Sequence, residues 1–165
     1  MKILVAYMSK TGNTKKVAEA IYDEIKGEKE LKRIEDVSDI GGYDLSFLGF
    51  PTHQFGPDKK TKELLVKHCV NGRKVALFIT HCSPEDIPEL PEWMGKFKES
   101  ASKANLVGFF DCQGELSKGL ELMMKIAPDK KMRFFAKNHN SQGQPDESRL
   151  RRAREFAREV MKATS

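Results

Sequence analysis

The sequence is poor in several features that define classes of protein. Its 165 residues include only three cysteines, Cys69, Cys82 and Cys112, an odd number with no C-x-x-C spacing. This pattern indicates neither a disulfide framework nor a zinc site, and it fits the reducing cytoplasm. No apolar run approaches the roughly 18 residues of a membrane-spanning helix. We therefore expect a soluble cytoplasmic protein with no membrane segment and no metal site.

The sequence also has fewer acidic than basic residues. The chain has 29 Lys and Arg against 24 Asp and Glu, which gives a formal net charge of +5. The two signs are interleaved, so no block of basic residues predicts nucleic-acid binding. The clearest basic cluster is Arg149, Arg151, Arg152, Arg154 and Arg158. We interpret this cluster as the solvated face of a helix, and we expect no nucleic-acid partner.

Five segments of the chain predict β-strands. Near-continuous apolar runs of this length are typical of parallel strands that are covered on both faces. The strong candidates are residues 3–7, 45–50, 75–80 and 106–111, and a weaker, more polar candidate is 30–37. Leu106 to Leu116 contains no long insertion that would interrupt the last strand.

Helical patterns lie between these strands. Apolar residues recur with helical periodicity in three stretches. The stripes are Val17, Ala18, Ile21 and Ile25; Ile87, Leu90, Trp93 or Met94, Phe97 and Ala101; and Leu150, Ala153, Phe156, Ala157 and Val160 within residues 145–162. Residues 136–146 are polar and rich in turn formers, and they predict a loop. Because strands and helices alternate, we expect one α/β domain over residues 1–165 with a doubly wound parallel sheet.

A polar turn follows the first predicted strand and leads directly into the first predicted helix. Its residues are Ser9, Lys10, Thr11, Gly12, Asn13 and Thr14. The first N–H groups of a helix have no partner within the helix, and the helix dipole makes this end attractive to anions. Hydroxyl groups add further donors, and the glycine allows the backbone to approach a ligand closely. The turn therefore predicts a phosphate-binding site.

The turn matches neither the P-loop nor the G-x-G-x-x-G pattern. It resembles the phosphate loop of the flavodoxin-like family, S/T-x-T-G-x-T after the first strand, through Ser9, Thr11, Gly12 and Thr14. The order of elements agrees over nearly the whole chain, and the uninterrupted last strand resembles the short-chain branch. The resemblance implies a five-stranded parallel sheet in the order 2-1-3-4-5 with helices on both faces. It also implies that the ligand is flavin mononucleotide, FMN.

Two further loops should then flank the isoalloxazine ring, one after the third strand and one after the fourth. The resemblance assigns Pro51, Thr52, His53, Gln54, Phe55 and Gly56 to the first loop, and Thr80, His81 and Cys82 to the second. Typical flavodoxins look as if they sandwich the ring between aromatic residues, and this chain has no aromatic side chain in the second loop except that of His81. A cation at His53 or His81 would favour the anionic reduced flavin and raise its potential. Nothing in the sequence indicates a lowered pKa at Cys82.

The resulting hypothesis is an FMN-binding redox protein that transfers electrons to a partner enzyme or to a small acceptor such as a quinone. No residue is assigned a catalytic role, because the flavin supplies the reactive centre. The alternative is a flavodoxin-like scaffold that has lost its cofactor and acts as a protein-interaction module. A phosphate-accepting signalling domain is disfavoured, because the first and third strands lead into Ser9 and Thr52 rather than carboxylates. The sequence leaves the oligomeric state open.

Overall fold

The computed structural model describes residues 1–165 and contains one five-stranded parallel sheet. The strands are β1 (Ile3–Tyr7), β2 (Lys29–Arg33), β3 (Leu45–Pro51), β4 (Lys74–His81) and β5 (Asn105–Gln113). Their order in the sheet is β2-β1-β3-β4-β5, and every neighbouring pair is parallel. This confirms the predicted doubly wound α/β topology.

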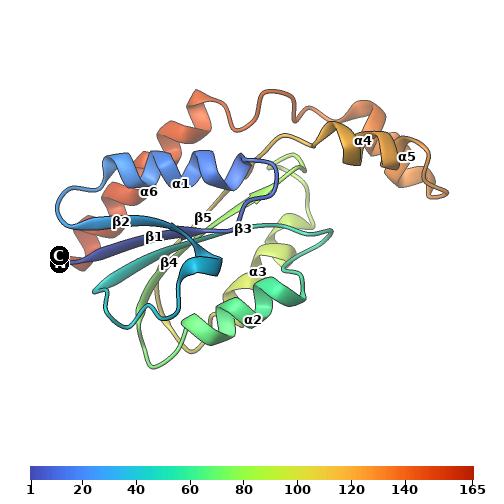
Figure 1. Cartoon of the computed structure of the whole chain (residues 1–165). Helices are drawn as coiled ribbons and strands as arrows, with labels where there is room; N and C mark the ends of the chain where they lie inside the picture. The colour runs from blue at the N-terminus through green and yellow to red at the C-terminus, as the bar shows by residue number, and fades with distance from the viewer.

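Helices cover both faces of the sheet (Figure 1). On one face lie α1 (Asn13–Glu24) and α6 (Glu147–Thr164), and on the other lie α2 (Lys59–His68) and α3 (Leu90–Ser100). Each face has an apolar cluster of 17 buried residues. The side chains of β1 alternate between these clusters, which is why its sequence is apolar at every position. No helix of the structure is both long enough and apolar enough to cross a membrane.

The strong strand predictions are confirmed, with ends that extend by one or two residues. The weak candidate, residues 30–37, is only partly a strand, because β2 ends at Arg33 and residues Ile34–Asp36 form the short 3-10 helix η1. β2 is an edge strand with the sequence KELKR, and charged side chains at a sheet edge discourage pairing with another chain. Ile34 then turns inward and is fully buried.

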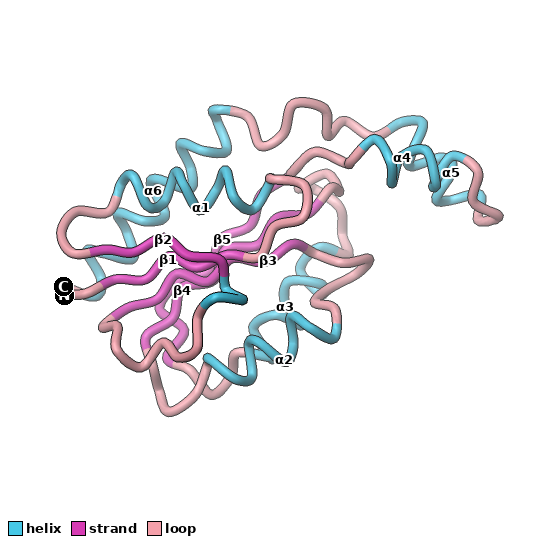
Figure 2. The backbone as a smooth tube through the Cα atoms, in the orientation of Figure 1, coloured by secondary structure: helices cyan, strands magenta, loops and turns pink.

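The predicted loop over residues 136–146 is wrong in its first part. Two helices that the sequence analysis did not predict, α4 (Lys118–Lys125) and α5 (Lys130–Asn138), precede it and include residues 136–138. Ser117 caps α4 by accepting from the N–H of Leu120, and Asp129 caps α5 in the same way. Figures 1 and 2 show that these two helices form a hairpin that stands away from the sheet. Both helices are amphipathic, so the helical pattern is present in the sequence, and the sequence analysis overlooked it.

His68, at the end of α2, is a buried imidazole without a partner. Neither ring nitrogen forms a hydrogen bond, and burial lowers the pKa of His68 below 6.5. The unfolded chain takes up a proton near pH 6.5 while the folded chain does not, so the free energy of unfolding falls as pH falls below that value.

We expect His68→Leu to raise the free energy of unfolding by about 1 kcal/mol at pH 7, because two unsatisfied polar atoms leave the core. The advantage of the variant should grow between pH 7 and pH 5. Urea unfolding of both proteins at several pH values measures this difference. A difference that does not change with pH would contradict the assignment of a neutral His68.

Candidate functional site

The carboxyl ends of β1, β3 and β4 surround a cavity of about 210 Å³. β2 is added on one side of β1 and β3 on the other, so the strand order reverses between β1 and β3. Ligands of open α/β sheets bind in the crevice at such a point. The residues that line the cavity are Met8, Ser9, Lys10, Thr11, Asn13, Thr14, Pro51, Thr52, His53, Asp58, Thr80, His81, Cys82, Glu115, Ser117 and Leu120. They come from the segments that follow four of the five strands.

A second hollow, of about 300 Å³, is larger but less suited to a specific ligand. It lies between the end of α1 and α6 and is lined by only six residues. Two of these residues, Glu24 and Arg158, already form an ion pair of 3.0 Å with each other. Specific sites usually bring together polar groups from several segments. The cavity at the strand ends meets this description and the second hollow does not.

The turn between β1 and α1 presents unpaired donors to the cavity. Gly12 has a positive φ of 96°, and its N–H donates to Ser9 Oγ at 3.1 Å. The backbone N–H groups of Thr11, Asn13 and Thr14 donate to no group of the chain. Together with the positive end of the α1 dipole, these N–H groups form an anion-binding surface.

Side chains of this turn tie three loops together. The hydroxyl groups of Thr14 and Thr80 share a buried hydrogen bond of 2.9 Å, which joins the start of α1 to the end of β4. Asn13 Nδ2 donates to the carbonyl oxygen of Glu115 at 2.8 Å, which joins the same turn to the segment after β5. Gly114 makes room for this contact, because a Cβ there would lie 2.7 Å from the Asn13 side chain. The cavity walls are therefore fixed relative to one another.

The loop after β3 contributes a buried hydroxyl group without a partner. The N–H of Thr52 donates to the carbonyl oxygen of Thr80 at 2.8 Å, which holds Thr52 at the end of the sheet. Its side-chain oxygen, Oγ1, is buried and forms no hydrogen bond, although Thr52 lines the cavity. A buried hydroxyl group loses its bonds to water, so it is normally paired. Thr52 Oγ1 is thus available to a ligand.

Most of the predicted site residues lie together around the cavity. Those that line it are Ser9, Lys10, Thr11, Asn13, Thr14, Pro51, Thr52, His53, Thr80, His81 and Cys82. Those that do not are Gly12, Gln54, Phe55 and Gly56. Gly12, Gln54 and Gly56 have positive φ angles and shape the two turns.

Phe55 is oriented differently from the prediction. Its side chain is 63% exposed, and its ring lies against Trp93 of α3, with 5.1 Å between the ring centroids. It therefore does not provide an aromatic wall for the cavity. Trp93 is only partly buried at the edge of the core, and Met94 takes the buried position of the helical stripe for which both were candidates.

The sequence analysis missed several residues that line the cavity. They are Met8, Asp58, Glu115, Ser117 and Leu120. Glu115 and Ser117 follow β5, so the rule that parallel strands end at one edge of the sheet was the available signal for them. Leu120 belongs to α4, which was not predicted, although the capping residue Ser117 and the amphipathic pattern after it were available signals for that helix.

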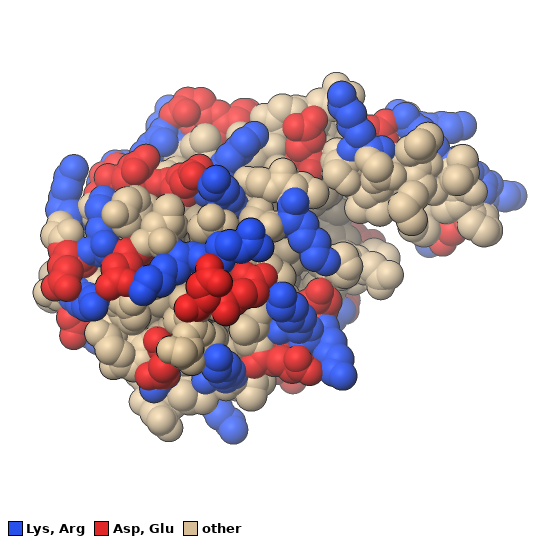
Figure 3. Space-filling view, viewed as in Figure 1, with Lys and Arg blue, Asp and Glu red and all other residues tan.

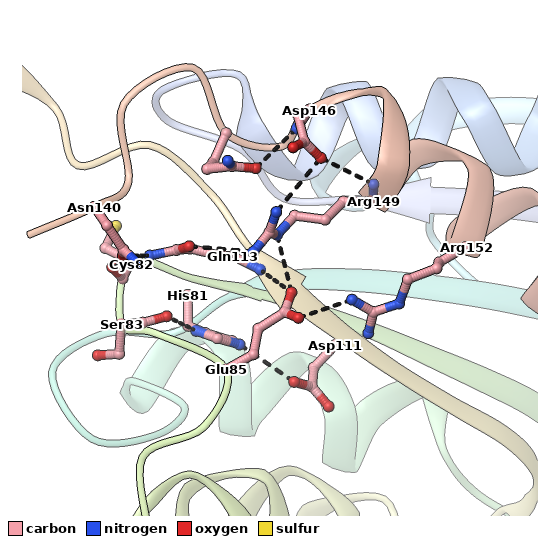
Figure 4. A network of polar contacts seen from close by, with 11 residues as sticks. His81, Cys82, Ser83, Glu85, Asp111, Gln113, Asn140, Asp146, Arg149 and Arg152 are labelled. Atoms are coloured by element: carbon pink, nitrogen blue, oxygen red, sulfur yellow. Dashed lines mark hydrogen bonds and ion pairs between the residues drawn. The ribbon is translucent and has the colours of Figure 1, made fainter.

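The surroundings of His81 do not support the prediction that it provides a cation beside the flavin ring. The side chain is 1% exposed, and its two nitrogens lie 2.9 Å from the carbonyl oxygen of Ser83 and 3.2 Å from Asp111 Oδ2 (Figure 4). A carbonyl oxygen only accepts, so Nδ1 carries a hydrogen atom. Any positive charge on this ring faces the Asp111 carboxylate. His81 is therefore not an uncompensated cation beside the cavity. His53 is exposed and lines the cavity together with the carboxylate of Asp58.

Glu85 anchors the loop that follows β4. Its carboxylate accepts hydrogen bonds from Arg149 Nε at 3.0 Å, from Arg152 Nη1 at 2.8 Å and from the N–H of Gln113 at 3.1 Å (Figure 4). Burial alone would raise the pKa of Glu85, but Arg152, the Gln113 N–H and Arg149 outweigh burial and lower it. The interpretation of the arginine cluster as a solvated face is therefore wrong for Arg149, which is 20% exposed, whereas Arg152 pairs with Glu85 but is itself exposed.

Gln113 extends this network to the cavity wall. Its Nε2 donates to the carbonyl oxygen of Cys82 at 3.2 Å and to Asn140 Oδ1 at 2.8 Å. The backbone of Cys82, which lines the cavity, is thereby connected through Gln113 to the loop before α6. The network fixes the β4 loop without contributing a side chain of its own to the cavity.

Cys82 is expected to react slowly with alkylating reagents, because burial raises the pKa of its thiol to about 11. Only the thiolate is nucleophilic, so iodoacetamide at pH 7.5 should modify Cys82 about 100-fold more slowly than an unperturbed thiol. Mass spectrometry of the folded protein measures the rate, and labelling in urea gives the unperturbed reference. Rapid labelling of Cys82 in the folded protein would contradict this assignment.

Comparisons with known proteins agree with this geometry. A family model described as a flavodoxin domain matches residues 4–158. The flavodoxin-like domain-containing protein BilS of Clostridioides difficile (strain CD3) is 37% identical over 172 residues, covering 98% of this chain and 97% of its own length. Among solved structures, a flavoprotein in complex with FMN from Lactobacillus acidophilus NCFM is 25% identical with a TM-score of 0.55, over 67% of this chain and 92% of that chain.

Oxidised flavodoxin 2 from Bacillus cereus covers more of the chain at lower identity. It is 21% identical with a TM-score of 0.60, over 98% of this chain and 99% of that chain, and it shows the fold alone. The family model and the relative from C. difficile both span nearly the whole chain. The chain therefore belongs to the flavodoxin family.

Proposed function

We propose that the chain binds FMN in the cavity at the strand ends and acts as an electron-transfer flavoprotein over residues 1–165. The observation that carries the proposal is the convergence of the unpaired N–H groups of the α1 turn and the unpaired hydroxyl group of Thr52 on one cavity. Membership of the flavodoxin family and the FMN complex of the L. acidophilus relative support it. When bound, FMN supplies a centre that accepts and releases electrons.

The residues present fit the two ends of this ligand. The turn of residues 9–14 would hold the phosphate group through N–H groups, hydroxyl groups and the helix dipole. The loops after β3 and β4 would frame the ring, with Thr52 Oγ1 and backbone groups as hydrogen-bond partners. No aromatic side chain of these loops lines the cavity apart from those of His53 and His81. Binding of the ring would therefore rest on hydrogen bonds and van der Waals contacts more than on aromatic stacking.

The size of the cavity determines whether an electron acceptor could reach a bound flavin. Ligand pockets typically have volumes of about 300–1,000 Å³, and this cavity of about 210 Å³ is smaller. Part of a ligand as large as FMN would remain exposed at the mouth, within reach of an acceptor. The acceptor is either a partner enzyme or a small molecule such as a quinone. All three thiols are free, which suits a reducing cytoplasm as the site of action.

Visible absorption spectra of the purified protein test this proposal, before and after FMN is added and the excess removed. We expect a bound flavin spectrum under at least one condition. If no flavin is retained under either condition, the proposal fails. The alternative, a cofactor-free interaction module, would then account for the intact fold.

Thr52→Val is expected to lower the affinity for FMN by about 10-fold while leaving the apo protein as stable as before or slightly more stable. Valine has nearly the same shape, and the hydroxyl group it removes is unsatisfied without a ligand, so only the loaded protein loses a hydrogen bond. Fluorescence titration with FMN and urea unfolding of the apo protein measure the two quantities. Thr164→Val, at the end of α6, is the control, and equal affinities of Thr52→Val and wild type would contradict the role of Thr52.

A further inference from the structure

The α4–α5 hairpin, residues 118–138, presents an apolar surface that the rest of the fold leaves uncovered. No residue of α4 is buried, and Ala136 is the only buried residue of α5. Large side chains of the hairpin are between 41% and 78% exposed: Leu120, Leu122, Met123, Ile126, Met132 and Phe134. Contiguous apolar patches on soluble proteins usually mark interaction sites, and methionine side chains adapt readily to a partner.

Basic residues border this apolar surface. The hairpin contains Lys118, Lys125, Lys130, Lys131, Arg133 and Lys137 against only Glu121 and Asp129. Lys125 pairs with Glu121, and Arg133 donates to the carbonyl oxygens of Ala127 and Pro128. The remaining lysines are exposed and form no ion pair within the chain. Figure 3 shows blue side chains around the tan surface of the hairpin.

The base of the hairpin lies at the mouth of the cavity. Leu120 and Ser117 line the cavity, although the rest of α4 extends away from it. Both ends of the hairpin are tied down beside it, because the N–H of Leu116 donates to Ser141 Oγ and the N–H of Glu115 donates to the carbonyl oxygen of Gln144, each at 3.0 Å. A molecule that covers Leu120 would therefore also cover part of the mouth.

We infer that the α4–α5 hairpin is the docking element for the electron-transfer partner, a protein whose contact surface is an apolar patch bordered by Asp and Glu. The inference rests on the proposed function, because the partner's acceptor has to face the mouth of the cavity. Lysines around an apolar centre favour such a partner, since complementary charge speeds encounter and fixes orientation. Apolar and aromatic side chains at the centre of the patch supply the contact itself.

Two other occupants fit the surface less well. A second copy of the chain would bring two sets of unpaired lysines together, which is unfavourable in a self-complementary interface. An anionic membrane surface would attract the lysines, but the two helices have only 8 and 9 residues and contain no tryptophan. Binding at a membrane interface scales with the apolar area that is buried, and two helices this short bury little.

A synthetic amphipathic helix tests the inference directly. The probe is a fluorescent peptide of 18 residues with leucines on one face and glutamates on both borders, and its counterpart has lysines in place of the glutamates. The protein variants are Leu122→Gln with Ile126→Gln, and Lys130→Glu with Lys131→Glu. The matched controls lie on α2, on the far face of the sheet: Val66→Gln, and Lys62→Glu with Lys67→Glu.

We expect the acidic peptide to bind the wild type and the α2 variants alike, and to bind each hairpin variant at least 10-fold more weakly. Saturating acidic peptide should also slow the release of bound FMN, because it covers the mouth of the cavity. The inference is overturned if the acidic and basic peptides bind equally well, or if the α2 variants lose affinity as much as the hairpin variants do. It is also overturned if FMN release is unchanged by bound peptide.

Two further measurements test whether a membrane or a second copy of the chain, rather than a partner protein, occupies this surface. Co-sedimentation with vesicles that contain phosphatidylserine, lost in the hairpin variants, would assign the surface to a membrane. A dimer in analytical ultracentrifugation, dissociated by Leu122→Gln with Ile126→Gln, would assign it to a second copy. Flavin spectra of every variant are recorded first, so a failure to bind FMN is seen separately from a hairpin that binds no acidic peptide.

Discussion

Replacing Thr11 by alanine together with Thr14 by valine is expected to lower the affinity for FMN by at least about 100-fold. Each hydroxyl group would donate to a charged phosphate group, and such hydrogen bonds contribute about 1.5–3 kcal/mol each. A total of about 3 kcal/mol corresponds to slightly more than two orders of magnitude in the dissociation constant. Fluorescence titration with FMN measures the change.

Riboflavin separates the phosphate contact from other effects, because it has the same ring and no phosphate group. The double variant should bind riboflavin about as well as the wild type does. Thr80→Val provides a second control, because it removes the same Thr14–Thr80 hydrogen bond while it keeps both hydroxyl groups of the turn. We expect it to lower the affinity by less than about 10-fold, which reflects one neutral hydrogen bond.

The outcome decides the role of the turn. If the double variant binds FMN as tightly as the wild type, the turn does not hold the phosphate group. If riboflavin and FMN lose affinity equally, the two substitutions act through the shape of the cavity. Only a loss confined to FMN supports the phosphate site that the free N–H groups of Thr11, Asn13 and Thr14 suggest.

The sequence predicted the sheet well because burial on both faces requires an apolar side chain at every position of a central strand. Residues 3–7 are the clearest case, since each is at most 9% exposed. Position at the carboxyl ends of parallel strands then brought the loops after β1, β3 and β4 to one cavity. The strands follow from periodicity, whereas the strand order that places these three loops together was implied by the resemblance to the flavodoxin-like family.

The orientation of individual side chains did not follow from the sequence. His81 pairs with Asp111, thirty positions later, and Phe55 lies on Trp93, so neither ring's position is encoded by its own loop. The two helices after β5 are a different case. Both are amphipathic and begin at a capping residue, Ser117 or Asp129, so their signals were present in the sequence and were overlooked, although apolar residues such as Ile126 and Phe134 face solvent rather than a core.

Glu85→Gln is expected to lower the free energy of unfolding by about 2–3 kcal/mol at pH 7. Removing one partner of a buried ion pair costs about 3–5 kcal/mol, and partial exposure of this site reduces that figure. The side chains of Glu85 and Arg149 are 26% and 20% exposed, so Arg149 would lose a partner in a place that water reaches poorly. The N–H of Gln113 would keep a weaker, neutral acceptor.

Glu24→Gln is the matched control, because Glu24 also pairs with an arginine of α6. That arginine, Arg158, is 55% exposed, so the control should lose no more than about 0.5 kcal/mol. The pKa of Glu85 is lowered in the folded state, so its contribution is fully present above pH 4.5 and declines as pH falls through its folded pKa. Urea unfolding between pH 3 and pH 7 should therefore show the difference between wild type and Glu85→Gln shrinking below pH 4.5.

The same substitution connects stability to the cavity. Glu85 does not line the cavity, but it holds the N–H of Gln113, whose side chain in turn holds the carbonyl oxygen of Cys82 in the cavity wall. A loosened wall must be ordered again when a ligand binds, so the affinity for FMN should fall several-fold in Glu85→Gln and stay unchanged in Glu24→Gln. If both variants lose equal stability and bind FMN equally well, the network is ordinary surface charge. If only Glu85→Gln lowers both the stability and the affinity for FMN, the β4 loop depends on the two arginines of the last helix. The cavity is then shaped by residues that do not line it.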